Sequence, residues 1–423
     1  MLIQFSIKNF MSIKEKVTFS MIAGSGDENI ENIINPNSSD RLLKSTAIYG
    51  ANASGKTNFI RAFTNSILTI RKSNIRQVNE KLLEMIPFKF DNETKNKPCE
   101  FEFMFIFKDI KYVYGFSADI NKVYDEYLYK YSSAKSTMIF DRTDVKKYKF
   151  IQADRGKLKD IETKNTDNKL FLATATAWNY EKTKDAYTWF SENIDTYDNF
   201  LVLNDMIVDR FEKSDKNGLR EFTIKLLKEA DIIIKGYNFE SNSAKGNNPF
   251  TLLINNMPVT NDNVEQKEIK ISTVHEVESK DGKLEEFNLD LFEESLGTQS
   301  LFFLSPILKD AFEKGKTIVV DEIDKSFHPL LVEYIIKLFH NTELNTNNAQ
   351  IIFNTHDTHL LNLNLFRREQ IWFVEKDYKK GATDLYPLED FSVRKTENIQ
   401  KGYLNGRYGA IPFIAMGDSL WTE

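Results

Sequence analysis

The residues Gly50 to Thr57 have the types and the spacing of a phosphate-binding loop, G-x-x-x-x-G-K-T. Glycine has no Cβ, so backbone N–H groups near Gly50 and Gly55 can close around phosphate oxygens. Lys56 can reach the β- and γ-phosphates of a nucleoside triphosphate, and the Thr57 hydroxyl can ligate Mg²⁺. The pattern predicts a Walker A site for ATP and Mg²⁺, which also includes the loop residues Asn52, Ser54 and Asn58.

The sequence around this loop has the order that a Walker A site requires. The apolar run 46–49 predicts a buried strand before the loop. Apolar residues then recur at helical spacing at Phe59, Ile60, Phe63, Ile67, Leu68 and Ile70. The predicted helix directs its positive dipole end toward the bound anion. The alternative, a chance glycine- and serine-rich turn, does not explain the order of strand, loop and helix.

Two later predicted strands end in further residues that could do chemistry. Asp321 and Glu322 follow the run 317–320, where Asp321 is placed to hold Mg²⁺ and Glu322 to orient and polarise an attacking water. His356 follows the run 350–353, which in a parallel sheet ends at the same edge as the Walker A loop. There the imidazole can contact the γ-phosphate and sense its loss. The alternatives are a solvated strand end and a capping or core histidine.

A small-residue turn from Ser295 to Gln299 opens another apolar helix. A helix N-terminus is a second anion site. In a chain that already has a Walker A loop, this suggests a dimer in which each copy covers the nucleotide of the other. We therefore include Ser295, Gly297 and Gln299 among the candidate nucleotide-binding residues. The alternative is an ordinary helix start that Ser295 caps.

Length and composition favour a globular protein of two or three domains. The chain has 423 residues, of which 41% are hydrophobic and 28% charged. Its net charge of −6 argues against nucleic-acid binding by bulk electrostatics, although basic clusters at 71–76 and 146–149 leave local contact open. The single cysteine, Cys99, excludes an internal disulfide framework and a cysteine-based zinc site. We expect it to be a buried small hydrophobe.

The N-terminus lacks the layout of a signal peptide, and no apolar run approaches the roughly 20 residues of a membrane helix. We therefore expect a cytoplasmic protein without a membrane partner. The insert between the motifs shows no metal or nucleophile constellation.

Hydrophobic periodicity predicts an α/β protein. Alternation predicts strands at 2–10 and 17–22, and a hairpin of 99–107 with 110–116 that turns at Lys108 and Asp109. Further strands are expected at 123–131 and 138–140. We expect 155–275 to be mostly helical, with helical spacing at Phe222, Leu226, Leu227 and Ala230. In the last third, the strand runs 317–320, 350–353 and 371–374 alternate with helices, which predicts a parallel or mixed sheet. The helix after the first of these runs has an expected apolar stripe of Leu330, Leu331, Tyr334, Ile335 and Leu338.

The motifs occur in a recognisable order: 7–10 (Ile-Lys-Asn-Phe), 50–58, 295–299, 321–322 and 355–357. This order resembles the ABC-type ATPases of the RecF/SMC/OLD class. More narrowly, it is similar to the AbiL-like and RloC-related abortive-infection ATPases of prokaryotic antiphage defence. The tail 403–412 also resembles that group. The resemblance covers 1–70 and 290–423, and the insert matches only in its order of β-rich and then helical parts.

The resemblance implies a P-loop ABC-type ATPase head with a mixed sheet. We expect this head to be discontinuous, formed by 1–72 and 290–423. A β-rich part, 73–150, would pack on it, and 151–289 would form a mainly helical lid or arm.

The resemblance also implies that heads form a homodimer or higher oligomer around two ATP molecules. Asp324, in the D-loop segment 323–326, would then contact the opposing copy. Ungapped alignment of the signature places Leu296 at the position of the phosphate-contacting serine, so Ser295 would substitute for it. No Q-loop glutamine can be placed.

Three functions follow from these observations. The leading one is a slow Mg²⁺-dependent ATPase that acts as sensor or scaffold in abortive-infection defence. It would control a companion effector, such as a Toprim-type nuclease or a toxin, in response to a phage trigger protein. The second is a RecF-like DNA-repair ATPase, which the acidic charge disfavours. The third is a module that binds ATP without hydrolysing it, which the intact pair Asp321 and Glu322 disfavours.

Overall fold

The computed structural model describes residues 1–34, 41–82, 84–133, 135–198, 205–243, 253–254, 257–258 and 267–412. Its internal contacts divide the chain into two compact units. The first comprises Met1–Tyr197, Lys314–Glu322 and Ile336–Glu423, and the second comprises Asp198–Glu313 and Ile323–Ile335. The Walker A loop, the acidic pair and His356 therefore belong to one unit, although more than 250 residues separate the loop from the pair.

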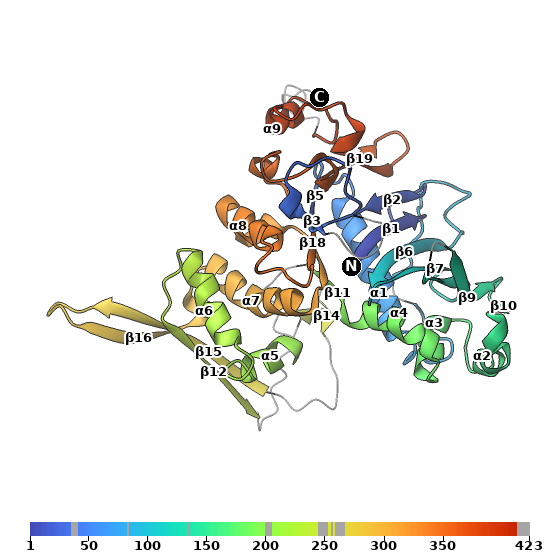
Figure 1. The fold of residues 1–423 in the computed structure, drawn as a ribbon, viewed down its shortest axis with the longest axis horizontal. Helices are drawn as coiled ribbons and strands as arrows, with labels where there is room; N and C mark the ends of the chain where they lie inside the picture. Colours follow the sequence, from blue (N-terminus) through green and yellow to red (C-terminus); the bar gives the residue numbers. More distant parts are fainter. Residues whose placement is uncertain are drawn as a thin grey trace, which may run out of the picture. The chain divides into compact units, whose positions relative to one another are not determined.

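A seven-stranded antiparallel sheet forms one part of the first unit (Figure 1). The predicted hairpin of β6 and β7 is confirmed, because Cys99 pairs with Ala118 at one end and Phe107 with Ile110 at the other. Lys108 and Asp109 turn the chain with φ of 50° and 59°, which suits the right-handed twist of the strands. In order, the strands are β10 (Lys147–Phe150), β9 (Ser136–Thr143), β8 (Val123–Tyr131), β7 (Ile110–Ala118), β6 (Cys99–Phe107), β1 (Leu2–Lys8) and β2 (Val17–Ser20).

The second sheet of this unit is mixed, as predicted. All neighbouring strands run parallel except β19 and β20, which are antiparallel. Strands β5, β17 and β18 are buried along their whole length, as expected for strands with both faces covered. In order, the strands are β11 (Ile194–Tyr197), β17 (Thr317–Val320), β18 (Gln350–Asn354), β5 (Ser45–Tyr49), β19 (Ile371–Asp377) and β20 (Ala382–Pro387).

Helix α1 (Lys56–Lys72) packs its apolar stripe into a core that both sheets share. The ring of Phe63 lies 3.8 Å from that of Phe5 in β1, and Val319 of β17 belongs to the same buried cluster. The buried Gln350 side chain adds a polar link, because its Nε2 donates to the carbonyl oxygen of Leu2 at 3.1 Å. Helices α2 (Arg155–Glu162), α3 (Phe171–Ala177) and α4 (Glu181–Glu192) complete this core. The phosphate loop is thus held at the start of a rigid helix.

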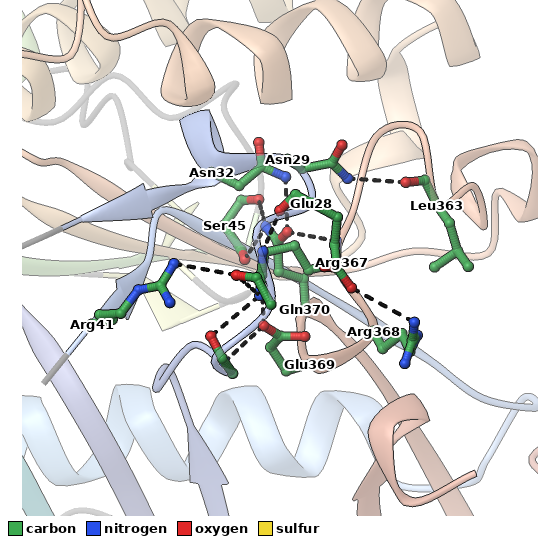
Figure 2. A network of polar contacts seen from close by, with 12 residues as sticks. Glu28, Asn29, Asn32, Arg41, Ser45, Leu363, Arg367, Arg368, Glu369 and Gln370 are labelled. Atoms are coloured by element: carbon green, nitrogen blue, oxygen red, sulfur yellow. Dashed lines mark hydrogen bonds and ion pairs between the residues drawn. The ribbon is translucent and has the colours of Figure 1, made fainter. Parts of the chain in front are cut away.

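A buried polar network fixes the chain at the amino end of β5 (Figure 2). Gln370 Nε2 donates to the Ser45 carbonyl oxygen at 2.9 Å, and its Oε1 accepts from Asn32 Nδ2 at 2.8 Å. Arg367, also buried, pairs with Glu369 at 2.6 Å and donates to backbone carbonyls of the segment before Asn32. The network anchors this early segment and short strands β3 (Ile33–Ile34) and β4 (Leu42–Leu43) to the parallel sheet.

The second unit contains helices α5 (Asp205–Glu212) and α6 (Leu219–Glu229) and most of α7 (Leu296–Lys314). Its three-stranded sheet has the order β12 (Gly236–Ser243), β15 (Lys267–Glu278) and β16 (Leu284–Asp290). A further pair is β13 (Leu253–Ile254) with β14 (Met257–Pro258). Helix α8 (Pro329–His340) begins in this unit and ends in the first.

The insert differs from the mainly helical segment that we expected at 151–289. Helices occupy the described residues from Arg155 to Glu229, but strands follow from Gly236 onward. The physical reason is a change of period: Ile269, Ile271 and Thr273 alternate with polar residues, which suits a half-buried strand. The division by contacts also places 73–197 with the phosphate loop, and the signature segment with the insert.

Across the described part of the chain, no helix combines the length and the apolarity that crossing a membrane requires.

Candidate active site

The phosphate loop connects β5 to α1 in a tight, curved path. Ala53 and Gly55 both have positive φ, 63° and 115°, which turns successive N–H groups toward the inside of the curve. A Cβ on Gly50 would lie 2.4 Å from the carbonyl oxygen of Val374, so only glycine fits there. Asn52 is exposed at the top of the loop. This conformation presents backbone donors to an anion at the N-terminus of α1.

Lys56 lies across this loop. Its side chain is buried, and Nζ donates to the carbonyl oxygens of Gly50 at 2.8 Å and Ala51 at 3.1 Å. The nearby Ser54 Oγ is buried and has no hydrogen-bond partner. A buried ammonium beside a buried hydroxyl without a hydrogen-bond partner fits an anionic ligand, which would neutralise the charge of the ammonium and accept from the hydroxyl. The residues present therefore fit the triphosphate that the motif predicts.

Two side chains that the sequence motifs did not identify support the loop from outside. The Thr383 hydroxyl, in β20, donates to the Ser54 carbonyl oxygen at 2.7 Å and lies 2.8 Å from Ser12 Oγ. Asn58 Nδ2 also donates to Ser12 Oγ, at 2.8 Å. The predicted nucleotide ligand Asn58 is thus engaged in the support of the loop. Ser12 and Thr383 are distant in sequence, so only the pairing of β20 beside the loop brings them together.

The acidic pair lies at the carboxyl end of β17 and is fixed by Asn354, the last residue of β18. Asn354 Nδ2 donates to Asp321 Oδ1, and the Glu322 N–H donates to Asn354 Oδ1. Asn354 is completely buried, whereas both carboxylates are partly exposed. Glu322 has a φ of 50°, a left-handed conformation that costs a residue with a side chain roughly 1–2 kcal/mol. Such strain is typical of functional positions.

The register of the parallel strands brings three predicted segments to one edge of the sheet. Val320 pairs with Phe353, and Asn354 pairs with Ile48, so β17, β18 and β5 end within two residues of the same level. Neighbouring strands lie about 4.8 Å apart. The acidic pair and the phosphate loop therefore follow strands separated only by β18. His356, which is exposed, continues beyond that middle strand toward the level of the loop.

The loop that carries His356 is tied to the phosphate-loop strand. Thr355 N donates to the Ile48 carbonyl oxygen at 3.2 Å, and the Tyr49 hydroxyl donates to the Asp357 carbonyl oxygen at 3.3 Å. The tail also contacts this loop: Gln400 Nε2, in α9 (Ile399–Leu404), donates to Thr358 Oγ1 at 3.2 Å. The segment that carries His356 is therefore hydrogen-bonded both to β5 and to α9.

The donor set is suitable for Mg²⁺ rather than for a metal held by protein alone. The described residues contain no group of three or more histidine, cysteine, aspartate or glutamate side chains that could hold a metal ion. Thr57 and Asp321 would each supply one oxygen ligand. Mg²⁺ is commonly held by one or two protein ligands together with substrate phosphates and water. The site thus fits a metal that arrives with its nucleotide.

The signature segment belongs to the second unit, which is described by itself. Ser295 Oγ accepts from Thr298 N at 3.1 Å, so Ser295 caps α7. The buried Gln299 side chain donates to the carbonyl oxygens of Glu294 at 2.8 Å and Phe292 at 3.3 Å. The alternative of an ordinary capped helix start is thus present in the structure, and the roles of Ser295, Gly297 and Gln299 toward a nucleotide stay predictions. Asp324 lies in the short helix Ile323–Ser326 of this unit.

Comparison with known proteins identifies one family. The model of a family described as "AAA domain, putative AbiEii toxin, Type IV TA system" matches residues 45–362, well over half of the chain. No curated protein matches.

Similar solved structures include the SmcHead bound to the C-winged helix domain of ScpA, with 13% identity and a TM-score of 0.40 over 91% of this chain and 97% of that one. Another is the Smc head domain from Pyrococcus furiosus, with an extended coiled coil and the C-terminal domain of ScpA bound. Its sequence identity is 14% and its TM-score 0.41, over 92% of this chain and 97% of that one. A third is the Smc head domain with a coiled coil and joint from Pyrococcus yayanosii. Its sequence identity is 10% and its TM-score 0.44, over 96% of this chain and 99% of that one.

Proposed function

This chain belongs to the AbiEii-type AAA-domain family, and from that premise we propose that it is an ATP-hydrolysing sensor or scaffold of a prokaryotic antiphage defence system. In this role it controls a companion effector, such as a Toprim-type nuclease or a toxin, after a phage protein triggers it. The family match supports an ATPase linked to abortive-infection systems. The effector and the trigger belong to the proposal alone.

One observation carries the ATPase part of the proposal. The parallel register brings the phosphate loop, the Asp321–Glu322 pair and His356 to the carboxyl edge of one sheet, where ligands of open α/β sheets bind. The buried Asn354 side chain then fixes the pair, because it donates to the Asp321 carboxylate and accepts from the backbone N–H of Glu322. A purely structural role for this edge would require neither a strained glutamate nor a buried lysine beside an unsatisfied hydroxyl.

The residues have distinct roles in the proposed reaction. Lys56 and the loop amides bind the phosphates, while Thr57 and Asp321 hold Mg²⁺. When bound, Mg²⁺ neutralises charge on the β- and γ-phosphate oxygens. Glu322 orients and polarises the attacking water, which must approach in line with the bond that breaks. His356 contacts the γ-phosphate, and loss of this contact on phosphate release changes the conformation of the loop that carries His356.

The proposal includes association of two copies. Ser295, Gly297 and Gln299 of one copy would complete the nucleotide site of the other, and Asp324 would contact the opposing copy. ATP would then stabilise the dimer by its differential affinity for the associated state. Sedimentation of the Glu322→Gln variant tests this arrangement: ATP is expected to shift it from monomer to dimer, and Ser295→Arg is expected to prevent the shift.

Phosphate release from Mg²⁺-ATP by the full chain tests the assigned chemistry. We expect Glu322→Gln to lower kcat by about 10²-fold or more with ATP binding retained, because it removes the base but not the phosphate contacts. Lys56→Ala is expected to abolish binding of labelled ATP. Full turnover by Glu322→Gln would contradict the proposed role of the acidic pair.

The defence role is tested in cells. A strain that carries this gene with its neighbours is expected to restrict phage plating, and the same strain with Glu322→Gln or without the neighbouring effector gene is expected not to. A gel-shift series with duplex DNA, with and without ATP, addresses the DNA-repair alternative. Salt-sensitive DNA binding together with DNA-stimulated turnover would favour repair over defence.

A further inference from the structure

The β15–β16 hairpin of the second unit has an outer edge, formed by β16, that no other strand of the described residues pairs with. In the described part of the chain, β16 pairs only with β15, and Figure 1 shows this hairpin reaching beyond helices α5 to α7 of its own unit. Every residue from 280 to 288 is exposed. The row of N–H and C=O groups on the outer side of β16 is therefore open to another strand.

Apolar side chains lie on the exposed hairpin where solvation alone would favour polar ones. Phe287 is 52% exposed, Val277 51% and Leu284 64%. The register pairs His275 with Phe287 and Val277 with Glu285, so Val277 and Phe287 are diagonal neighbours on one face. A two-stranded ribbon of this kind is marginally stable in water unless another element covers it. Exposed apolar groups in such a position are typical of an interaction surface.

The hairpin and the residues that follow it are strongly acidic. Residues 276–294 contain eight carboxylates and two lysines, a net charge of −6, which equals that of the whole chain. From 284 to 294 there are five carboxylates and no basic residue. Glu276 and Glu286 lie directly opposite each other, and Lys235 forms ion pairs with both. Lys235 thus offsets the repulsion between these two carboxylates of the hairpin. Lysine or arginine side chains of a neighbouring strand could pair with the remaining carboxylates in the same way.

Charge complementarity selects one kind of occupant. A second copy of β16 would place like charges opposite each other, which destabilises strand pairing. Nucleic acid would be repelled for the same reason. A strand that alternates lysine or arginine with apolar residues would instead match both the carboxylates and the exposed Phe287. The geometry points to β16 as the docking edge for an extended basic segment of a partner protein, which adds to the sheet as a fourth strand.

This inference goes beyond the proposed ATPase and does not depend on it. The hairpin lies in the second unit, whereas the phosphate loop, the acidic pair and His356, which bind and hydrolyse ATP in the proposed function, lie in the first. Peptide binding and ATP binding are therefore measured on the same preparations as separate quantities. Loss of one without the other distinguishes failure of this inference from failure of the proposed function.

The test uses a labelled peptide that alternates four lysines with three valines, to match the seven residues of β16. Fluorescence anisotropy on the full chain is expected to show saturable binding. Glu285→Lys/Glu286→Lys is expected to weaken it by about tenfold or more. Phe287→Ser is expected to weaken it by about two- to fivefold. A peptide with the same composition but its lysines in one block should bind more weakly, because it cannot present the alternation of a strand.

A matched charge reversal controls for general attraction of cations to an acidic protein. Asp160→Lys/Glu181→Lys changes two carboxylates that are 70% and 76% exposed on helices of the first unit, and should leave binding unchanged. No binding, or equal weakening by both reversals, would overturn the inference. Self-association of the wild-type chain that Phe287→Ser abolishes would identify a second copy as the occupant, and would also overturn it.

Discussion

Replacing Asn354 by alanine tests whether the acidic pair works only when it is held in place. Asn354 is completely buried at the end of β18 and makes two hydrogen bonds to the pair, one to Asp321 Oδ1 and one from Glu322 N. The first bond is to a charged group. Truncation therefore removes both the donor that fixes one carboxylate and the acceptor that fixes the backbone of the other.

The expected magnitude follows from these two bonds. A hydrogen bond to a charged group contributes about 1.5–3 kcal/mol, and an unsatisfied buried N–H costs about 1–3 kcal/mol. Because Asp321 and Glu322 are partly exposed, water replaces part of what is lost. We expect Asn354→Ala to lower the free energy of unfolding by about 2 kcal/mol. If positioning is lost to a similar extent in the reaction, kcat falls about 10- to 100-fold.

A buried asparagine elsewhere in the same unit provides the control. Asn345 is 2% exposed and makes three hydrogen bonds to the backbone of Phe339 and Ala349, away from the acidic pair. Asn345→Ala should therefore lower stability comparably with kcat unchanged. The assays are urea unfolding and phosphate release at saturating ATP. Binding of labelled ATP in the absence of Mg²⁺ should stay unchanged in Asn354→Ala, because the phosphate loop is untouched. A destabilised Asn354→Ala that keeps wild-type kcat would refute the reasoning.

Three further outcomes are expected. Burial lowers the pKa of His340 to about 3, and its Nε2 lies 2.7 Å from Ser45 Oγ. Below pH 6.5 this histidine is therefore protonated in the unfolded chain but stays neutral in the folded chain. Between pH 7 and 5 this lowers the free energy of unfolding by about 2 kcal/mol, a loss that urea unfolding should show to be absent in His340→Gln. Because Glu322 has positive φ, Glu322→Gly should be about 1 kcal/mol more stable than Glu322→Ala in thermal unfolding, with both inactive. A Cβ on Gly55 would lie 2.4 Å from Thr383 Oγ1, so Gly55→Ala should weaken labelled-ATP binding by about tenfold or more in equilibrium dialysis.

The elements that sequence reasoning predicted well are those that local rules determine. The apolar runs at 317–320 and 350–353 became the parallel strands β17 and β18, because strands buried on both faces need no alternation. The turn at Lys108 and Asp109 followed from its position between two alternating strands. In each case the residues that determine the element lie within ten positions of one another in the sequence.

The predictions that were wrong concern segments where hydrophobic spacing alone does not determine the type of element or the face that is buried. Helical spacing around Phe222 was correct for α6, but it was extended into 236–275, where the described residues are strands. In α8 we expected an apolar stripe that included Leu330, which is 69% exposed. The buried positions are Val332, Ile335, Ile336 and Phe339. The period was right, and the phase was set by tertiary packing that spacing alone does not encode.

The candidate site divides in the same way. The motif residues Lys56, Thr57 and Asp321 were identifiable because their chemistry depends on short spacing. Ser12 and Thr383, which support the phosphate loop, could not be identified from the sequence, because 371 positions separate the two hydrogen-bonded residues. The role of Asn354 was hidden for a related reason: an asparagine that ends a strand is common, and only the register with β17 places it beside the acidic pair.

The hydrogen bonds that support the candidate site differ in length and burial, and this difference bears on how the proposed hydrolysis would be signalled. The phosphate loop is held by Thr383 and the acidic pair by Asn354, both through buried or short hydrogen bonds. The loop after His356 is instead held by longer, partly buried bonds from the Tyr49 hydroxyl at 3.3 Å and Gln400 Nε2 at 3.2 Å. Weak, partly exposed bonds exchange most readily for water. These two contacts join the segment after His356, where the proposed sensing of the γ-phosphate would occur, to β5 and, through Gln400, to α9 of the C-terminal tail. In the proposed reaction, release of phosphate would therefore act on the tail through Gln400, while Thr383 continues to hold the phosphate loop and Asn354 the acidic pair.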